Sequence, residues 1–559
     1  MYQEIIKRNH EETHPQKKQS LYNLLALPSV QIVILLAISV GIFFFNLGGW
    51  DLWNPDEPRY AQVAKEMMKS GHWFLPHLNS RVYPDKPPVF FWLIALCSMI
   101  QGEVTSFSAR FPSALAAVLG ILITYLLGRR LFNSQAGFIS ALVLATTVEY
   151  FWLGRRANID MTLTLFIISA LFFFYKGYQE SSKWSYYLFY LFMGIATLTK
   201  GPVGFILPTL TVVVYLISKR DLKKLKTVAS HPGLILFFVV ILIWLIPAFI
   251  QGGGSYMNEI IFDQILGRVH DSWSHKRPFY YYFVDLPPIM QPWFFFLPSA
   301  FIFFFSRKRE IKEDYLFPLV WFMTVFIFFS LCSGKRELYT LPLFPAFALM
   351  VGFLWNRFFE QSEDILVKRV ITIPFYLLLW VFLAACLCIP FIYRLLGYEY
   401  QQAFHFYPSA LFLGFCTLLA LFLLFKKKTV FSLSLLIVMM VGSFLYSSGF
   451  VFPSLDQFKS AKPFSVRVKA QMKESDLLGS YYVKDAAFNF YTGIDDIKQL
   501  KTPGDLVDFF LQSKNRAFCI IHREDLKDLL RIMPFRLFEW DGAKIGGREI
   551  VLISIRERS

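Results

Sequence analysis

Long apolar runs recur along this 559-residue chain and decide its class. The runs at residues 30–45, 234–250 and 374–389 hold no charged side chain, and each is close to the length that a helix needs to cross the hydrocarbon of a bilayer. The pattern predicts a polytopic α-helical membrane protein with about thirteen transmembrane helices. We expect these helices to start near residues 30, 107, 135, 160, 184, 201, 233, 292, 316, 338, 370, 408 and 429.

The two ends of the chain differ from its middle. Residues 1–29 are polar and basic, and no small-residue cleavage site follows the first apolar run, so we expect a cytoplasmic leader before a retained helix. After thirteen crossings, residues 453–559 then lie on the outer side. This tail predicts a small α/β domain, because strand-like runs alternate in it with helical ones. The strand-like runs are residues 477–483, 517–521 and 550–555, and the helical runs are 503–511 and 523–532.

Two long outer loops interrupt the predicted transmembrane domain at residues 30–452. They cover residues 48–106 and 251–291, and loops of this length usually carry function. The first loop predicts an amphipathic helix over residues 56–70. It also holds an apolar run that ends near Gln101 and is too short to cross, which favours a helix in the membrane interface.

The net charge of +16 changes this picture little. Most basic residues are distributed among short loops on one side of the predicted spans, where the positive-inside rule explains them without a nucleic-acid partner. Of the six cysteines, only Cys519 lies in a polar stretch, so neither a disulfide framework nor a zinc site is indicated.

A second set of cations breaks the charge rule, because its members lie on the outer side near the ends of spans. At that depth they can neutralise the phosphate of a lipid whose tail stays in the hydrocarbon. The alternative is that each one only extends to lipid headgroups. The set comprises Arg59, Lys86, Arg155, Arg156, Lys200, Arg268, Lys276, Arg277, Lys335 and Arg336.

Few acids accompany these cations, and their positions are informative. Asp56 and Glu57 open the helix after the first span, and Asp160 opens the fourth span directly after two arginines. Helix capping and an ion pair at a helix start are the structural alternatives. Carboxylates that face cations also suit group transfer, in which one acid activates a hydroxyl while the cations hold a leaving phosphate.

At these residues the sequence resembles the lipid A aminoarabinose transferases and the wider family of bacterial protein-mannosyltransferase-like enzymes, which have the C-type glycosyltransferase fold. The resemblance covers most of the membrane region, and it depends on the order and loop positions of short motifs more than on any one of them. The motifs are Asp56-Glu57-Pro58-Arg59-Tyr60-Ala61, Asp85-Lys86-Pro87-Pro88 with Trp92, Ala109-Arg110-Phe111-Pro112-Ser113-Ala114, Asn158-Ile159-Asp160-Met161, Leu198-Thr199-Lys200-Gly201-Pro202, and Ser333-Gly334-Lys335 with Tyr339 before Leu341-Pro342.

The resemblance implies an inverting transfer from a sugar on undecaprenyl phosphate, with Asp56 at the reacting centre and Asp160 as the second family acid. Glu57 joins them as a candidate catalytic residue. The residues that match those holding the carrier phosphate are Arg59, Lys86 and Tyr339, and the charge pattern adds Lys335, Lys200 and Arg268. Pro58 stands where the aminoarabinose enzymes carry Thr, which leaves the sugar open.

The expected function is therefore a glycosyltransferase of the bacterial inner membrane, whose periplasmic site modifies lipid A or a related envelope acceptor. A protein O-mannosyltransferase-like enzyme is the alternative within this class. A transporter of lipid-linked sugars is disfavoured, because the charges gather at the ends of spans instead of the midplane. The sequence indicates no particular cofactor, and a divalent cation shared by Asp56, Glu57 and Asp160 is an open alternative.

Overall fold

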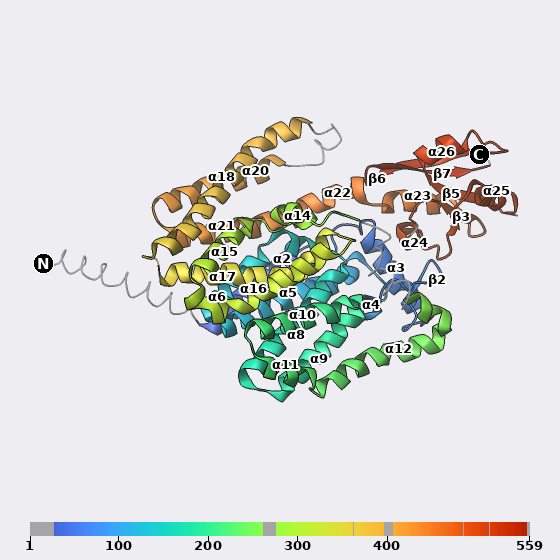
Figure 1. The fold of residues 1–559 in the computed structure, drawn as a ribbon. Coiled ribbons are helices and arrows are strands. Elements are labelled where there is room, and N and C mark those ends of the chain that lie inside the picture. The colour runs from blue at the N-terminus through green and yellow to red at the C-terminus, as the bar shows by residue number, and fades with distance from the viewer. Residues whose placement is uncertain are drawn as a thin grey trace, which may run out of the picture.

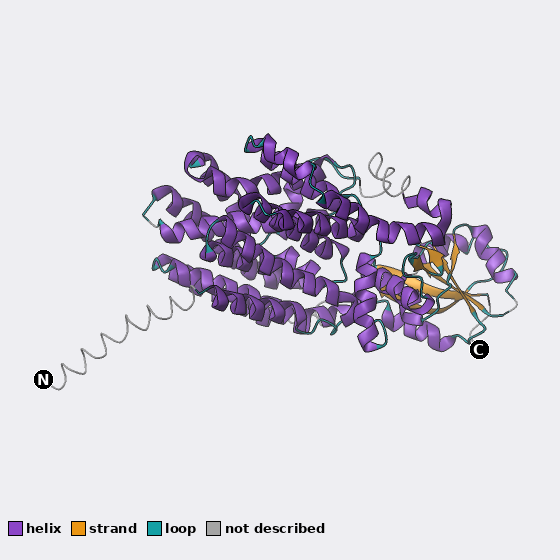
Figure 2. Cartoon of the chain, turned by 90° about the horizontal axis from the view of Figure 1, so that it is seen from below, coloured by secondary structure: helices purple, strands orange, loops and turns teal. Residues whose placement is uncertain are grey.

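The computed structural model describes residues 27–260, 276–361, 363–395, 406–484, 486–513 and 515–555. Within these ranges the chain forms a long bundle of helices with a small mixed α/β domain at one end (Figure 1). The second view shows the same division, with all strands of the larger sheet at that end (Figure 2). The predicted class, a helical membrane protein with a small carboxyl-terminal α/β domain, is confirmed.

The bundle consists of one helix before the long first loop and of the helices that follow this loop. They are α2 (Pro28–Phe44), α5 (Ser106–Leu131), α6 (Ser134–Ala145), α7 (Val148–Gly154), α8 (Ile159–Glu180), α9 (Lys183–Lys200), α10 (Val203–Ser218), α11 (Leu222–Ala229), α12 (Gly233–Asn258), α14 (Tyr281–Ile289), η2 (Trp293–Phe295), α15 (Phe296–Ser306), α16 (Lys308–Leu331), η3 (Glu337–Leu343), α17 (Phe344–Glu360), α18 (Ile365–Leu395), α20 (Phe406–Phe425), α21 (Thr429–Tyr446) and η4 (Ser447–Val451).

Seven helices in the described ranges are long and apolar enough to cross a membrane, or eight if α6 and α7 form one broken span. These two helices meet at an angle of 67°, where the sequence analysis expected a single straight helix from residue 135. Five further apolar helices are shorter than a full crossing. The chain is thus a multi-pass membrane protein, but the count of thirteen spans is not confirmed.

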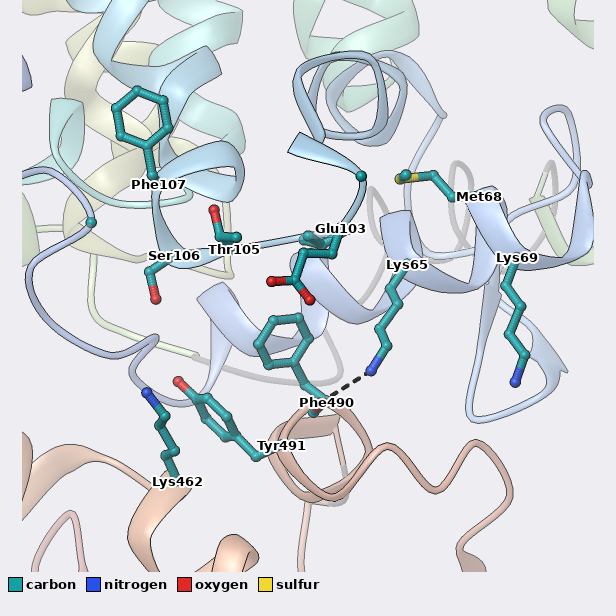
Figure 3. A pocket seen from close by; sticks show the side chains of 13 residues that line it. Lys65, Met68, Lys69, Glu103, Thr105, Ser106, Phe107, Lys462, Phe490 and Tyr491 are labelled. Atoms are coloured by element: carbon teal, nitrogen blue, oxygen red, sulfur yellow. Dashed lines mark hydrogen bonds between the residues drawn. The ribbon is translucent and has the colours of Figure 1, made fainter. Parts of the chain in front are cut away.

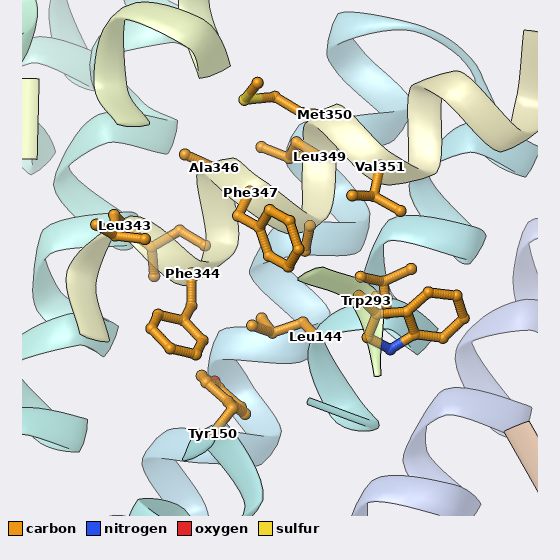
Figure 4. Close-up of a cluster of buried hydrophobic side chains, with 14 of the residues drawn as sticks. Leu144, Tyr150, Trp293, Leu343, Phe344, Ala346, Phe347, Leu349, Met350 and Val351 are labelled. Atoms are coloured by element: carbon orange, nitrogen blue, oxygen red, sulfur yellow. The ribbon is translucent and has the colours of Figure 1, made fainter. Parts of the chain in front are cut away.

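The core of the bundle is built around α17, which is almost entirely enclosed by its neighbours. Its residues Phe344 and Phe347 point toward Leu144, Tyr150 and Trp293 from three other elements (Figure 4). Aromatic side chains bury large apolar areas, and such side chains make this core dense. The neighbouring helices α5 and α6 approach so closely that a Cβ at Gly137 would lie 2.6 Å from the carbonyl oxygen of Tyr125. Only glycine fits there.

The loop between α2 and α5 folds as the sequence predicts. It contains α3 (Asp56–Ser70), a hairpin of β1 (His77–Leu78) and β2 (Arg81–Val82), and α4 (Val89–Gln101). One face of α4 packs against α3 through Phe90 and Phe91, while its other face leaves Leu96, Met99 and Ile100 exposed. An exposed apolar stripe on a short helix beside a bundle suits the expected position in the membrane interface.

The carboxyl-terminal domain is a five-stranded sheet with helices packed on it. Its helices are α22 (Phe452–Lys459), α23 (Lys462–Gln471), α24 (Ala486–Thr492), α25 (Pro503–Leu511) and α26 (Arg523–Leu529). Its strands are β3 (Leu477–Tyr481), β4 (Lys498–Leu500), β5 (Ala517–His522), β6 (Phe538–Ile545) and β7 (Arg548–Ser554), in the order β4-β3-β5-β7-β6. The three predicted strands are β3, β5 and β7. In β6, an irregularity of pairing between Glu539 and Asp541 breaks the alternation, which explains why this strand was missed.

A polar junction fastens this domain to the first loop. Asp456 accepts hydrogen bonds from the Trp53 indole nitrogen at 2.7 Å and from the backbone N–H of Asp51 at 3.0 Å. Trp53 also forms an isolated antiparallel bridge with Ser460. Since Asp56 follows three residues after Trp53, the junction holds the start of α3 in place.

Candidate active site

Asp56 lies in the first turn of α3, and both of its carboxylate oxygens are bound by arginines. Oδ1 pairs with Arg59 one turn later, and Oδ2 accepts a hydrogen bond of 2.8 Å from Arg336. The side chain is 13% exposed. The residue at the cap position is Pro55, and no side chain caps this helix start. The geometry therefore favours an electrostatic role for Asp56 over the capping alternative.

The arginines keep Asp56 ionised. Burial by itself would raise the pKa of this carboxyl group, but Arg336 and Arg59, with a smaller contribution from Arg156, leave the pKa below its usual value. Burial would likewise lower the pKa of Arg336, which Asp56 and the more distant Asp160 raise above its usual value. A negative charge is thus held among cations at neutral pH.

Glu57 faces away from this group and is almost fully buried, with 1% of its side chain exposed. It forms a two-point ion pair with Arg110 of α5, at 2.8 and 3.2 Å, and contacts Arg156 at 3.3 Å. It also accepts hydrogen bonds from the backbone N–H groups of Trp53 and Ala157, each at 3.0 Å. With this many donors around it, Glu57 is placed to fix the loop and not to touch a substrate.

The electrostatics of Glu57 agree with a structural position. Burial would raise its pKa, but Arg110, Arg156 and the backbone donors outweigh burial and bring the pKa to about 2. Arg110 in turn donates to the carbonyl oxygens of Leu47, Trp50 and Asp51. The pair therefore fastens the segment that leads from α2 into α3. The sequence analysis expected a catalytic residue here, which the surroundings of Glu57 do not support.

Asp160 forms the second acidic point of the site, at the start of α8. Its carboxylate pairs with Lys200, the last residue of α9. The helix start itself is capped by Asn158, whose side chain accepts from the backbone N–H groups of Asp160 and Met161, so the Asp160 carboxylate is left for Lys200. The Lys200 ammonium lies 4.3 Å from the ring centre of Tyr339. Three of the predicted site residues therefore lie together.

The short helix η3 joins the two groups, because Arg336 directly precedes it and Tyr339 belongs to it. Lys335, expected to bind phosphate, instead turns inward: its ammonium donates to the carbonyl oxygens of Cys332 and, at 3.2 Å, Arg277. Only 4% of it is exposed. Arg336 is in extended conformation, where consecutive side chains point to opposite sides. This alternation explains why Arg336, and not its neighbour, reaches Asp56.

Arg59 and Lys86 are two further predicted phosphate ligands, and Arg59 pairs with Asp56. Arg59 has a buried Nε without a hydrogen-bond partner in the described part of the chain, and a buried donor of this kind is suited to a ligand. Lys86 is half-buried in the segment before α4, next to Asp85, whose charge acts on Arg59. Arg268 lies outside the described residues, so its position is not given.

A separate group of acids lies beside these cations. Glu149 of α7 is nine-tenths buried, with 7% exposed, and has no hydrogen bond or ion pair among the residues described. The charges of Glu337 and Asp285 act on it most strongly, and Arg156 is the nearest balancing cation. Asp285 also has one buried oxygen without a hydrogen-bond partner in the described ranges. No local pattern in the sequence marks this group, because its members come from α7, α14 and η3, which lie far apart in the chain.

The site does not fit the divalent cation that was left open. Within the described ranges, no group of three or more His, Cys, Asp or Glu residues could hold a metal ion. Asp56, Glu57 and Asp160 are each paired with a different arginine or lysine. We therefore derive no step through a metal.

The sequence of this chain is similar to a family model and to several known proteins. Residues 85–246 match the family model described as dolichyl-phosphate-mannose-protein mannosyltransferase. An uncharacterised protein of Aquifex aeolicus is 30% identical over 329 residues, which cover 58% of this chain and 64% of that protein. The undecaprenyl phosphate-alpha-4-amino-4-deoxy-L-arabinose arabinosyl transferase of Edwardsiella ictaluri is 30% identical over 346 residues, which cover 61% and 62%. In each case the match spans less than two thirds of the relative.

Solved structures extend the likeness to nearly the whole chain. The crystal structure of ArnT from Cupriavidus metallidurans bound to undecaprenyl phosphate superposes with a TM-score of 0.76 at 19% identity, covering 93% of this chain and 97% of that one. The archaeal oligosaccharyltransferase AglB from Archaeoglobus fulgidus gives a TM-score of 0.53 at 13% identity, covering 89% and 69%. At these identities the likeness shows a shared fold.

Proposed function

We propose that this chain, which has the C-type glycosyltransferase fold of ArnT, transfers a sugar from undecaprenyl phosphate to lipid A or a related acceptor of the bacterial envelope. The named activity of the Edwardsiella relative supports the donor and the reaction class. The observation that carries the proposal is the ionised Asp56 carboxylate between Arg59 and Arg336, with the Asp160, Lys200 and Tyr339 group joined to it through η3.

In the proposed reaction an acceptor oxygen attacks the anomeric carbon from the face opposite the carrier. The new carbon–oxygen bond forms as the bond to the carrier phosphate breaks, and the carrier leaves with the electron pair. Arg59, Lys86 and Lys200 neutralise the charge that develops on this phosphate, and the Tyr339 hydroxyl is a further donor. Inversion at the anomeric carbon follows from this single displacement.

The acceptor decides what Asp56 does. A phosphate acceptor is already anionic, so Asp56 would hold no proton and would stabilise positive charge on the sugar ring instead. A hydroxyl acceptor must lose its proton, and Asp56 would then be the general base. In both cases the two arginines keep the carboxylate charged and oriented, which makes Asp56 the catalytic residue that we favour, with Asp160 as the second.

The acids beside the site indicate the chemical class of the transferred sugar. A buried carboxylate such as Glu149 is costly unless a cation meets it, and Glu337 and Asp285 add to the negative charge there. An ammonium group on the transferred sugar would satisfy these acids. This favours an amino sugar, in agreement with the 4-amino-4-deoxy-L-arabinose in the name of the relative, over a neutral hexose.

A protein O-mannosyltransferase-like activity is the second candidate, and the family match over residues 85–246 favours it. The two candidate activities differ in the sugar donor and in the acceptor.

To distinguish them, membranes that contain the chain are incubated with undecaprenyl-phosphate aminoarabinose or undecaprenyl-phosphate mannose, and the masses of lipid A and of envelope proteins are measured. We expect an added amino-pentose on lipid A. A hexose added to protein alone would replace our proposal by the alternative.

We also propose that the site faces the periplasm, with residues 1–29 in the cytoplasm and residues 453–559 outside. The outward position of lipid-linked donors and the basic leader support this orientation. A reporter fused after Ser559 tests it, and we expect activity of a reporter that works only in the periplasm. A reporter signal from the cytoplasm would overturn the orientation and the role of the outer cations.

A further inference from the structure

A polar cavity of about 720 Å³ lies away from Asp56, between the first loop and the carboxyl-terminal domain. Its walls come from the second half of α3, from residues 102–107 ahead of and within the start of α5, and from α23 and α24 (Figure 3). Lys65 is nine residues beyond Asp56 on α3, so the two side chains start about 13 Å apart along the helix axis. The cavity is therefore distinct from the candidate active site.

Three lysines in its lining, Lys65, Lys69 and Lys462, make the cavity suited to an anion. Lys65 donates one hydrogen bond, of 3.3 Å, to the carbonyl oxygen of Phe490 across the cavity (Figure 3), which leaves two of its three N–H donors. Lys69 pairs with Asp495 and Lys462 pairs with Asp51, but these lysines are 68% and 53% exposed. Water screens such pairs, so both ammonium groups can turn toward a ligand.

The electrostatics at Lys65 also favour an anion in the cavity. Partial burial lowers its pKa, and the repulsion from Lys469 and Lys69 lowers it further against the pull of Asp495. An anion in the cavity would relieve that repulsion. The start of α5 borders the same space. A capping box already binds the backbone N–H groups of Thr105 and Ser108, but the positive end of the helix dipole still favours an anion there.

The cavity also lies at the membrane surface. It is bordered by Gly48, just beyond the end of α2, and by Phe107 in the first turn of α5, both at the ends of apolar helices. The adjoining helix α4 exposes Met99 and Ile100 at 51% and 88%, which suits insertion into the interface. At this depth the abundant anion is the phosphate of a lipid headgroup.

We propose that this cavity binds the phosphate of a membrane-lipid headgroup, which then links α3 to the carboxyl-terminal domain. Lys65 holds the phosphate, and Lys69 and Lys462 approach it from the two sides. Glu103 also lines the cavity, and its carboxylate accepts a hydrogen bond from a hydroxyl or a primary ammonium group of the same headgroup. Phosphatidylglycerol and phosphatidylethanolamine provide such donors, whereas the quaternary amine of phosphatidylcholine does not.

The test uses the full-length protein in detergent and counts retained lipids by native mass spectrometry during titration with dioleoyl phosphatidylglycerol or dioleoyl phosphatidylcholine. We expect phosphatidylglycerol to bind more tightly, and Lys65→Gln to weaken it about tenfold, as removal of one charge-assisted contact does. Lys65→Arg should retain binding. Lys473→Gln is the matched control, because Lys473 is an exposed lysine of the carboxyl-terminal domain that does not line the cavity.

Two results would overturn the proposal. One is equal retention of both lipids, and the other is an unchanged affinity in Lys65→Gln with an unchanged melting temperature. Inorganic phosphate is titrated in parallel, and binding of it that depends on Lys65 without retention of either lipid would replace the headgroup by a soluble phosphate. If Lys65→Gln fails to fold, the double variant Lys69→Gln/Lys462→Gln changes only exposed side chains and should still weaken phosphatidylglycerol binding several-fold; unchanged binding there would count against the site.

Discussion

Arg336 donates a hydrogen bond of 2.8 Å to Oδ2 of Asp56, although 280 positions of sequence separate the two residues. Arg59 holds the other oxygen of the same carboxylate, from one turn further along α3. The first loop and the segment ahead of η3 thus meet at a single charged group. Each end of this contact can be changed without altering the helices that carry it.

Asp56→Asn should reduce sugar transfer by about a hundredfold or more while the protein stays folded and still binds the lipid donor. The amide keeps the size of the side chain but removes the charge that faces the sugar. Transfer is measured with labelled undecaprenyl-phosphate sugar, and melting temperature and donor binding are measured on the same sample.

The matched control is Asp364→Asn, which also removes one partner of an arginine pair, here with Arg307, and keeps the cap of α18. This variant should remain active. Transfer by Asp56→Asn within a few-fold of the unaltered protein would move the reacting carboxylate to Asp160.

Arg336→Gln should lower transfer at least tenfold with little change in melting temperature, because Arg336 is 29% exposed and its main contact is Asp56. Without Arg336, the pKa of Asp56 should rise toward its usual value, since the strongest lowering charge is gone. The lower end of the pH–rate profile should then shift to higher pH.

Lys335→Met is the contrasting change at the adjacent position. It should cost about 1–3 kcal/mol of stability, because the carbonyl oxygens of Cys332 and Arg277 lose their donor in a buried place. Binding of the lipid-linked sugar donor by the folded fraction should stay the same. The reverse outcome, normal stability with lost donor binding, would return Lys335 to the phosphate site.

The sequence predicted the class of the fold, and it singled out Asp56, Asp160 and Lys200 as candidates, because both inferences depend on local patterns. Apolar runs locate helices, and the charges at their ends fix the depth of the site. It could not choose between Lys335 and Arg336, since the direction of each side chain depends on the register of an extended segment that only the packed structure defines. Nor could it separate Asp56 from Glu57, which are adjacent in the chain but contact different arginines.

Lys86→Ala should weaken binding of the carrier phosphate by about 2–3 kcal/mol, the usual cost of one charge-assisted contact in a partly dry site. The measurement is a titration of the purified protein with undecaprenyl phosphate. Lys473→Ala provides the control, because Lys473 is an exposed lysine of the carboxyl-terminal domain that lies in neither site. Equal affinities for all three proteins would show that Lys86 only extends to lipid headgroups.

Glu57→Gln should remove a stability that depends on pH. The pKa of Glu57 is about 2 in the folded protein against an ordinary value of 4.5, so its contribution is present above pH 4.5 and is lost as pH falls from 4.5 toward 2. A shift of this size corresponds to about 3 kcal/mol. Melting temperatures measured from pH 7 down to this range should fall less steeply in the variant.

The starting stability of Glu57→Gln should also be lower, because Arg110 keeps its charge but loses its partner in a buried place. Identical slopes for the two proteins would mean that Glu57 does not control acid stability.

Glu149→Gln should reduce the preference for an aminated donor. The amide cannot balance an ammonium group, so the ratio of kcat/KM for an amino-sugar donor over its hydroxyl analogue should fall by about tenfold. Comparison within one variant cancels any general loss of activity. An unchanged ratio would assign Glu149 to the bundle interior and leave the sugar to other residues.

The junction of Asp456 and Ser460 with Asp51 and Trp53 has a consequence for engineering. A carboxyl-terminal domain taken from a relative would carry its own version of only one half of this junction. Such a chimera should be productive only if residues 50–53 are exchanged together with it, since the same short segment also sets where α3 begins. The chain beyond residue 452 and residues 50–53 thus form one transplantable unit, although about four hundred positions lie between them.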